Sequence, residues 1–191
     1  MQVQMLLKKL ANIEVDIICP LHGPVLTENI GYYVDKYNTW SSYEPEDKGI
    51  FIACASIHGN TKKAAEKLKE MLEEAGAEKV AMADLCTEDI HEAVEDAFRY
   101  DRMVLAASSY DGGVFPPMAE FLHLLKIKNF QKRTVAIIEN GSWGPTAARV
   151  MKSELEGMKA IEIVEPVITI RSAMKPENET QMKELIAALV K

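Results

Sequence analysis

The chain carries at residues 50–61 an apolar run that leads directly into a polar turn: Ile50-Phe51-Ile52-Ala53-Cys54-Ala55-Ser56-Ile57-His58-Gly59-Asn60-Thr61. The apolar run has the length and composition of a buried strand. From Thr61 to Ala75 apolar side chains recur with the 3.6-residue period of a helix, and Gly76 is a helix-stop signal. The stretch therefore predicts a strand, a turn and a helix in that order.

The same alternation of strand and helix continues to the end of the chain. The predicted strands are Gly49–Ala55, Lys79–Asp84, Arg102–Ala107, Thr134–Glu139 and Ile161–Ile170, the last of them bent at Pro166. The predicted helices are Thr61–Ala75, Thr87–Phe98 with Thr87 as its cap, Pro116–Leu125, Pro145–Gly157 and Glu177–Val190. Five strands alternating with five helices predict an α/β fold, a doubly wound parallel sheet with helices on both faces.

Three segments that follow predicted strands combine glycine with polar or aromatic residues. The first opens a helix and offers hydroxyl, amide and backbone N–H donors, which suit an anion such as a phosphate. The second and third join glycine to an aromatic side chain, which suits a flat ring lying against the backbone. Taken singly, each segment is equally explained as a helix cap or a turn. The candidate cofactor-binding residues are Ser56, Ile57, His58, Gly59, Asn60, Thr61, Ser108, Ser109, Tyr110, Asp111, Gly112, Gly113, Asn140, Gly141, Ser142, Trp143 and Gly144.

Composition and motifs argue against several other functions. The net charge of −7 argues against a nucleic-acid partner, and no apolar run reaches the roughly 20 residues of a membrane span. Three cysteines without a C-x-x-C pair indicate a reducing, cytoplasmic setting. Ser142 lacks the G-x-S-x-G setting of a hydrolase nucleophile, and the histidines do not have metal-ligand spacing. The residues themselves indicate no catalytic group.

Residues 1–48 differ from the rest of the chain. They predict a helix from Met5 to Leu10, a short strand from Val15 to Cys19 and a second helical stretch, followed by a polar linker at 41–48. So few elements cannot bury a stable core alone. We therefore predict two parts, 1–48 and 49–191, of which the first is the end of another domain.

With these motifs in hand, the chain resembles the C-terminal part of a flavodiiron protein, or A-type flavoprotein. The matching pieces are 56–61, 110–117 and 140–144, together with Pro20-Leu21-His22-Gly23-Pro24, which resembles the end of the family's diiron domain. The resemblance covers essentially the whole chain. One departure is that Pro145-Thr146 follow Gly144 where the family usually continues with glycine and an aromatic residue.

The resemblance implies a flavodoxin-like domain that binds FMN. Its five-stranded sheet would have the order 2-1-3-4-5, the order that flavodoxin itself exemplifies. Residues 1–48 would be the remnant of a metallo-β-lactamase-like diiron domain plus a linker. The FMN would relay electrons from a rubredoxin-like donor to a diiron site that reduces oxygen or nitric oxide and that is absent from this chain.

Two further implications concern assembly and metal. Flavodiiron proteins form dimers, so a homodimer is plausible for this chain. In that family the histidine matching His22 is the last metal ligand, and we expect His22 to bind metal only if an upstream diiron domain is present. This chain by itself would then be an electron-transfer flavoprotein without the oxidoreductase active site.

Two other functions stay open at this point. One is a stand-alone NAD(P)H-dependent FMN reductase, which would need a nicotinamide site, and the sequence has no separate dinucleotide fingerprint. The other is a flavodoxin-shaped binding module that holds no cofactor. Hydride transfer from NADH or NADPH would indicate the FMN reductase. The absence of a flavin spectrum after FMN is added would indicate the module without cofactor.

Overall fold

The computed structural model describes residues 2–190 and divides into two compact units at the junction between Glu46 and Asp47. The first unit holds α1 (Gln2–Leu10) and α2 (Ile30–Ser41). The side-chain amide of Gln4 joins these helices by donating to Asn38 Oδ1 at 3.0 Å and to Ser41 Oγ at 2.8 Å. The assignment of this unit to the end of another domain stays a prediction.

The strand predicted at Val15–Cys19 is wrong. The structure has instead a single isolated antiparallel bridge between Ile18 and Leu26. A strand needs a neighbour along its whole length to pair its backbone groups, and the described part of this unit offers that pairing at one position.

The second unit is the predicted parallel sheet with its helices. Its strands are β1 (Asp47–Ala55), β2 (Val80–Asp84), β3 (Tyr100–Tyr110), β4 (Gly113–Val114), β5 (Arg133–Asn140), β6 (Ile161–Ile163) and β7 (Ile168–Ile170). Its helices are α3 (Asn60–Glu74), α4 (Ile90–Arg99), α5 (Pro116–Ile127), α6 (Ala147–Glu156) and α7 (Pro176–Leu189). The sheet order is β2-β1-β3-β5-β6, which confirms the predicted 2-1-3-4-5 arrangement, since β5 and β6 are the fourth and fifth predicted strands.

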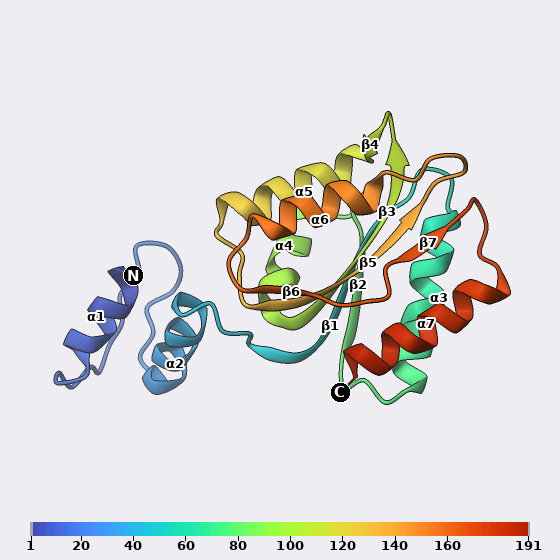
Figure 1. The fold of residues 1–191 in the computed structure, drawn as a ribbon. Helices are drawn as coiled ribbons and strands as arrows, with labels where there is room; N and C mark the ends of the chain where they lie inside the picture. The colour runs from blue at the N-terminus through green and yellow to red at the C-terminus, as the bar shows by residue number, and fades with distance from the viewer. Residues whose placement is uncertain (1, 191) are drawn as a thin grey trace. The chain divides into compact units, whose positions relative to one another are not determined.

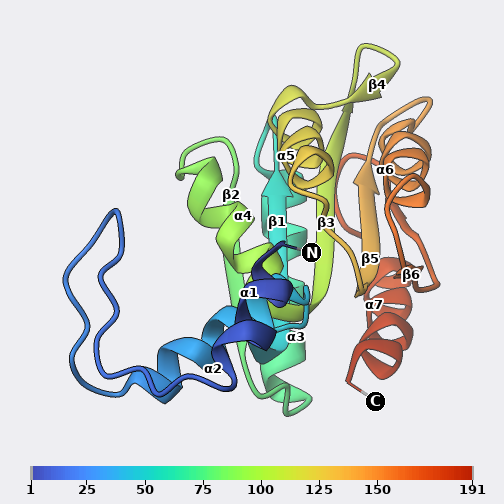
Figure 2. The same cartoon turned by 90° about the vertical axis from the view of Figure 1, so that its left-hand side faces the viewer.

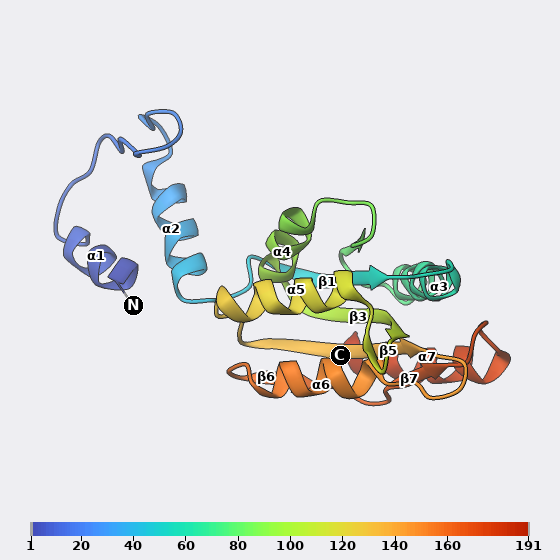
Figure 3. The same cartoon turned by 90° about the horizontal axis from the view of Figure 1, so that it is seen from above.

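The sheet is buried on both faces, as the composition of the strands predicts. Along β1, Phe51 and Ala53 pack in one core with α4, α5 and α6, whereas Ile52 and Cys54 pack in the other with α3 and α7. Figure 1 shows these helices on the two sides of the sheet. Within the layers α4 contacts α5, α5 contacts α6, and α3 contacts α7. Figure 3 shows the same helices from above. The alternation follows from the two-residue period of a strand.

Three boundaries differ from the prediction for physical reasons. The fifth predicted strand is split, because β6 pairs with the start of β5 and β7 with its end, on either side of the cis Glu165–Pro166 bond. The cap of α4 is Asp89, which accepts the N–H of His91 at 2.8 Å, and not Thr87. The third strand extends to Tyr110 because its last residues pair antiparallel with β4.

The parallel strands bring the predicted site residues to one edge. Ala55 at the end of β1 is in register with Ala107 of β3, and Ser108 of β3 is in register with Asn140 of β5. Figure 2 shows the arrows of β1 and β5 pointing to the edge that carries β4. None of the helices among residues 2–190 is long and apolar enough to cross a membrane.

Candidate functional site

The candidate site lies at the carboxyl ends of β1, β3 and β5, and it consists of three segments. We call them the first (56–61), second (108–113) and third (140–144) rim segments. Several of these residues lie in regular structure and not in loops. Ser108, Ser109 and Tyr110 end β3, Gly113 begins β4, Asn140 ends β5, and Asn60 and Thr61 begin α3.

The first rim segment presents the start of a helix. Ser56 Oγ accepts the N–H of Gly59 at 3.0 Å, which closes the turn, and Gly59 has a φ of 84° that favours glycine. Gly59 is also the N-cap of α3, so no capping side chain accepts the N–H groups of the first helical turn. These N–H groups and the positive end of the helix dipole suit a phosphate.

A hydroxyl pair joins the first and second rim segments. Thr61 is 1% exposed, and its Oγ1 lies 2.9 Å from Ser108 Oγ, which is also buried. The hydroxyls therefore bond to each other across the ends of β3 and α3. They hold the two segments together, and their direct contact with a ligand stays a prediction.

The second rim segment is a tight hairpin. Tyr110 pairs with Gly113, and the two residues between them, Asp111 and Gly112, have φ values of 47° and 70°. A two-residue loop with positive φ at both positions is a type I′ turn, for which Asp-Gly is a favoured sequence. Tyr110 stays 51% exposed, with its ring 5.8 Å from that of Phe115.

The third rim segment packs closely on the second. A Cβ added to Gly141 would lie 3.0 Å from Pro145 Cα and 3.1 Å from Ser109 Oγ, so a larger residue here would require Pro145 or Ser109 to shift. Beyond it, Ser142, Trp143 and Gly144 are exposed, and Trp143 is 98% exposed. A large apolar ring left almost wholly in solvent is available to stack on a ligand.

Two more predicted contact residues have partners inside the protein. Ser109 Oγ accepts the N–H groups of Thr146 at 2.8 Å and Ala147 at 3.1 Å, and thereby caps α6. Asn140 Nδ2 donates to the Ser172 carbonyl at 2.9 Å, and the Ser172 N–H donates to Asn140 Oδ1 at 3.2 Å. These side chains hold the second and third rim segments in place through hydrogen bonds to neighbouring backbone groups.

Sequence reasoning missed two residues that shape the site. Thr146 Oγ1 donates to the Gly113 carbonyl at 2.7 Å. Glu139 is buried, and its carboxylate accepts the Ala148 N–H at 2.9 Å and the Thr169 hydroxyl at 2.8 Å. A carboxylate at the end of an otherwise apolar strand was a signal for such a cap. Thr146 gave no comparable signal.

An ion pair lies beside the first rim segment. Lys62 Nζ, in the first turn of α3, is 2.9 Å from Asp84 Oδ2, and Asp84 Oδ1 accepts the Cys86 N–H at 3.1 Å. Burial raises the pKa of Asp84, but the hydrogen bonds from Lys62 and Cys86 outweigh it and hold that pKa below its ordinary value. The ammonium of Lys62 is thus engaged with a carboxylate next to the anion site.

Removing this ammonium is expected to lower stability in a pH-dependent way. In Lys62→Met, the buried Asp84 carboxylate loses its charged donor, so its pKa rises. A carboxyl with a depressed folded pKa adds stability above its unfolded pKa of 3.8, and this is lost as the pH falls through the folded pKa. We expect the urea midpoint of the variant to lie below that of the wild type at about pH 7, and the difference to narrow below about pH 4.

The control for this prediction is Lys67→Met on the same helix. It removes the ion pair of Lys67 with Glu70, whose side chains are 39% and 63% exposed, so little stability depends on it. A difference between Lys62→Met and the wild type that stays constant from neutral to acid pH would contradict the role given to Asp84.

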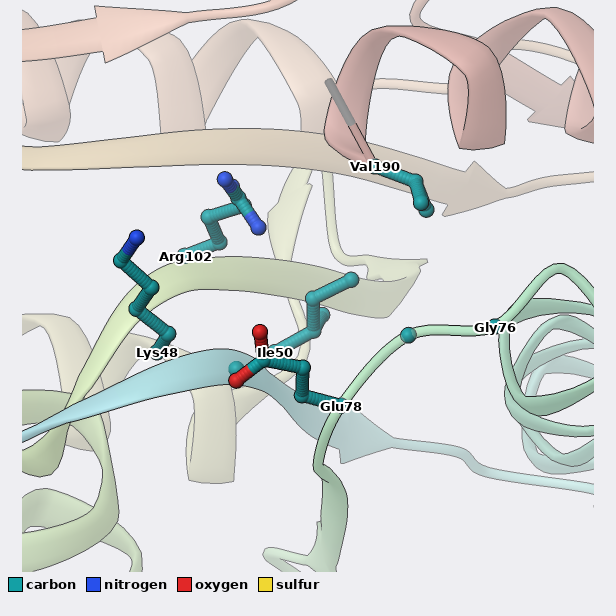
Figure 4. Close-up of a pocket in the computed structure, with 8 residues that line it drawn as sticks. Lys48, Ile50, Gly76, Glu78, Arg102 and Val190 are labelled. Atoms are coloured by element: carbon teal, nitrogen blue, oxygen red, sulfur yellow. The ribbon is translucent and has the colours of Figure 1, made fainter.

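One pocket of the described residues lies away from the rim segments. Its volume is about 180 Å³, and Lys48, Ile50, Glu78 and Arg102 are among its lining residues (Figure 4). Lys48 and Arg102 belong to the amino-terminal parts of β1 and β3. This is the edge of the sheet opposite to the rim segments. The uncapped N–H groups of α3 and the exposed rings of Tyr110 and Trp143 lie instead at the rim.

No group of three or more His, Cys, Asp or Glu residues among residues 2–190 could hold a metal ion. His22 lies in the first unit, between α1 and α2. The described residues therefore supply no ligand set around it.

Comparisons with known proteins agree with this fold. The family model for the flavodoxin domain matches residues 51–163. Among curated proteins, an uncharacterized protein of Methanocaldococcus jannaschii is 24% identical over 173 residues, and a nitric oxide reductase of Moorella thermoacetica is 22% identical over 175. These alignments cover 90% and 91% of this chain but 43% of either relative, so the chain spans less than half their length.

Solved structures give the same result. The rubredoxin oxygen:oxidoreductase of Desulfovibrio gigas superposes with a TM-score of 0.88 at 19% identity, over 99% of this chain and 48% of that one. The flavodiiron protein of Giardia intestinalis superposes with a TM-score of 0.89 at 18% identity, over 98% and 46%. At these identities the likeness shows the fold. It is a flavodoxin-like fold resembling the flavodoxin domain of flavodiiron proteins.

Proposed function

Since the chain belongs to the flavodoxin domain family, we propose that it binds FMN non-covalently at the edge formed by the three rim segments. The observation that carries the proposal is their convergence, with Tyr110 51% exposed on the second segment and Trp143 98% exposed on the third. An anion site at a helix start beside two exposed aromatic rings suits a phosphorylated, flat ligand.

The residues present fit this cofactor. The first turn of α3 would hold the phosphate with backbone N–H groups, assisted by the side chains of Ser56 and Asn60. A Cβ added to Gly59 or Gly112 would meet no atom of the described residues within 4 Å, so the backbone at both positions faces open space. The hairpin and Trp143 would hold the ring and exclude water from its faces. When bound, FMN supplies an electron carrier for one or two electrons.

In finer detail, we propose that the chain is the electron-relay part of a flavodiiron-type oxygen or nitric oxide reductase. The matched structures cover 98–99% of the chain, so their alignments include residues of the first unit as well. The proposal includes residues 1–48 as the end of a metallo-β-lactamase-like domain plus a linker, because Pro20-Leu21-His22-Gly23-Pro24 resembles the end of the family's diiron domain. The diiron domain of the parent protein would take up the electrons, and a homodimer would bring domains of two subunits together.

The electron donor in this proposal is a rubredoxin-like protein. Its support is the name of one matched structure, a rubredoxin oxygen:oxidoreductase. Reduction of the FMN-loaded chain by reduced rubredoxin, but not by NADH or NADPH, would separate this function from that of a nicotinamide-dependent FMN reductase.

A titration tests the binding of FMN directly. We expect FMN added to the flavin-free protein to lose fluorescence and to bind with a submicromolar Kd. Riboflavin, which lacks the phosphate, should bind at least about tenfold more weakly, because the N–H groups at the start of α3 then lack an acceptor. Unchanged flavin fluorescence across the titration would rule out the proposal and favour a module without cofactor.

A further inference from the structure

The hairpin of the second rim segment is tied to the start of α6. Thr146 Oγ1 donates to the Gly113 carbonyl at 2.7 Å, and Ser109 Oγ accepts the N–H groups of Thr146 and Ala147. These bonds join residues 33 to 38 positions apart in the sequence. They fix the first turn of α6 against the hairpin, so a side chain from this turn has a defined place beside it.

Arg149 projects from this part of α6 to the hairpin. Its Nη2 donates to the Gly112 carbonyl in a long hydrogen bond of 3.5 Å. The side chain is exposed, and its guanidinium forms no ion pair within the part of the chain that the structure describes. By contrast, the ammonium of Lys62, at the first rim segment, is paired with Asp84. Arg149 therefore brings a full positive charge to the turn at 111–112.

We propose that Arg149 is a positioning residue that favours the reduced form of a flavin bound against the hairpin. The inference rests on the proposed binding of FMN. Two electrons and one proton added to the FMN ring leave it with one additional negative charge. A guanidinium held at the Gly112 carbonyl stabilises that charge more than it stabilises the neutral oxidised ring. Because the guanidinium is exposed, salt weakens the effect.

The test is a redox titration of the FMN-loaded chain with dithionite and a reference dye. We expect Arg149→Met to bind oxidised FMN within about threefold of the wild type. Its affinity for reduced FMN should fall by about tenfold more, which for a two-electron couple lowers the midpoint potential by about 30 mV. Arg149→Lys keeps the charge, so its midpoint potential should lie above that of Arg149→Met by at least half of the amount by which the wild type does.

The matched control is Lys152→Met, which removes one positive charge from the same helix. Lys152 pairs with Glu165 at 2.8 Å and not with the hairpin, so its midpoint should equal that of the wild type. Added salt should lower the midpoint of the wild type more than that of Arg149→Met. Equal midpoints for Arg149→Met and Lys152→Met in a chain that binds FMN would overturn the inference and leave the proposed function intact. Failure of the wild type to bind FMN would overturn both.

Discussion

Trp143→Ala is expected to weaken FMN binding by about 5- to 150-fold and to leave the unfolding of the flavin-free protein unchanged. Stacking of a flat heterocycle on an aromatic side chain contributes about 1–3 kcal/mol, which converts to this range of affinities. The side chain of Trp143 is 98% exposed, so it adds almost nothing to the folded state in the absence of a ligand. Fluorescence titration gives the affinity and urea unfolding gives the stability.

Two further variants make this prediction specific. Trp143→Phe keeps a ring and should retain most of the affinity. Trp40→Ala removes an exposed tryptophan from α2, where its Nε1 donates to Glu46 at 2.8 Å, and should leave FMN binding unaltered. If Trp143→Ala bound FMN as tightly as the wild type, the third rim segment would have no part in holding the ring.

Phe121→Ala is expected to lower the free energy of unfolding by about 3–5 kcal/mol. Phe121 is on the buried side of α5 and is 0% exposed, with its ring 6.3 Å from that of Phe51 in β1. Truncation removes the apolar surface that the ring buries and leaves a cavity between helix and sheet. Since domains are stable by only about 5–15 kcal/mol, this is a large share of the total.

Urea unfolding without added flavin measures this effect. The control is Ile127→Ala at the end of the same helix, where the side chain is 63% exposed and the expected change is below about 0.5 kcal/mol. A change below about 1.5 kcal/mol for Phe121→Ala would mean that the core around α5 collapses to fill the cavity, or that the helix packs less tightly than the structure has it.

The sheet could be predicted from the sequence because the amino-acid composition of its strands indicates that both of their faces are buried. Met103-Val104-Leu105-Ala106-Ala107 is apolar on both of its alternating faces, and both are buried. The turn at Asp111-Gly112 also had a local signal, since this dipeptide favours a type I′ turn. The antiparallel pairing of β3 with β4 on either side of the turn was not predicted.

The side-chain bonds that shape the site could not be predicted in the same way. Ser109 with Thr146, Asn140 with Ser172 and Glu139 with Thr169 are partners about 30 or more residues apart. Local propensity and periodicity carry no information about such pairs, because they exist only once the strands are in register. The sequence therefore indicated three candidate segments at one edge of the sheet, but not which of their residues support the others.

The hydroxyl pair of Thr61 and Ser108 has a consequence for the speed of ligand capture. It connects the ends of α3 and β3 within the protein itself, with no ligand required as a bridge. A binding site that is already ordered before the ligand arrives loses little conformational entropy on binding, and no slow conformational change has to precede association. Association should then follow simple second-order kinetics, with no lag or saturation of the observed rate at high ligand concentration.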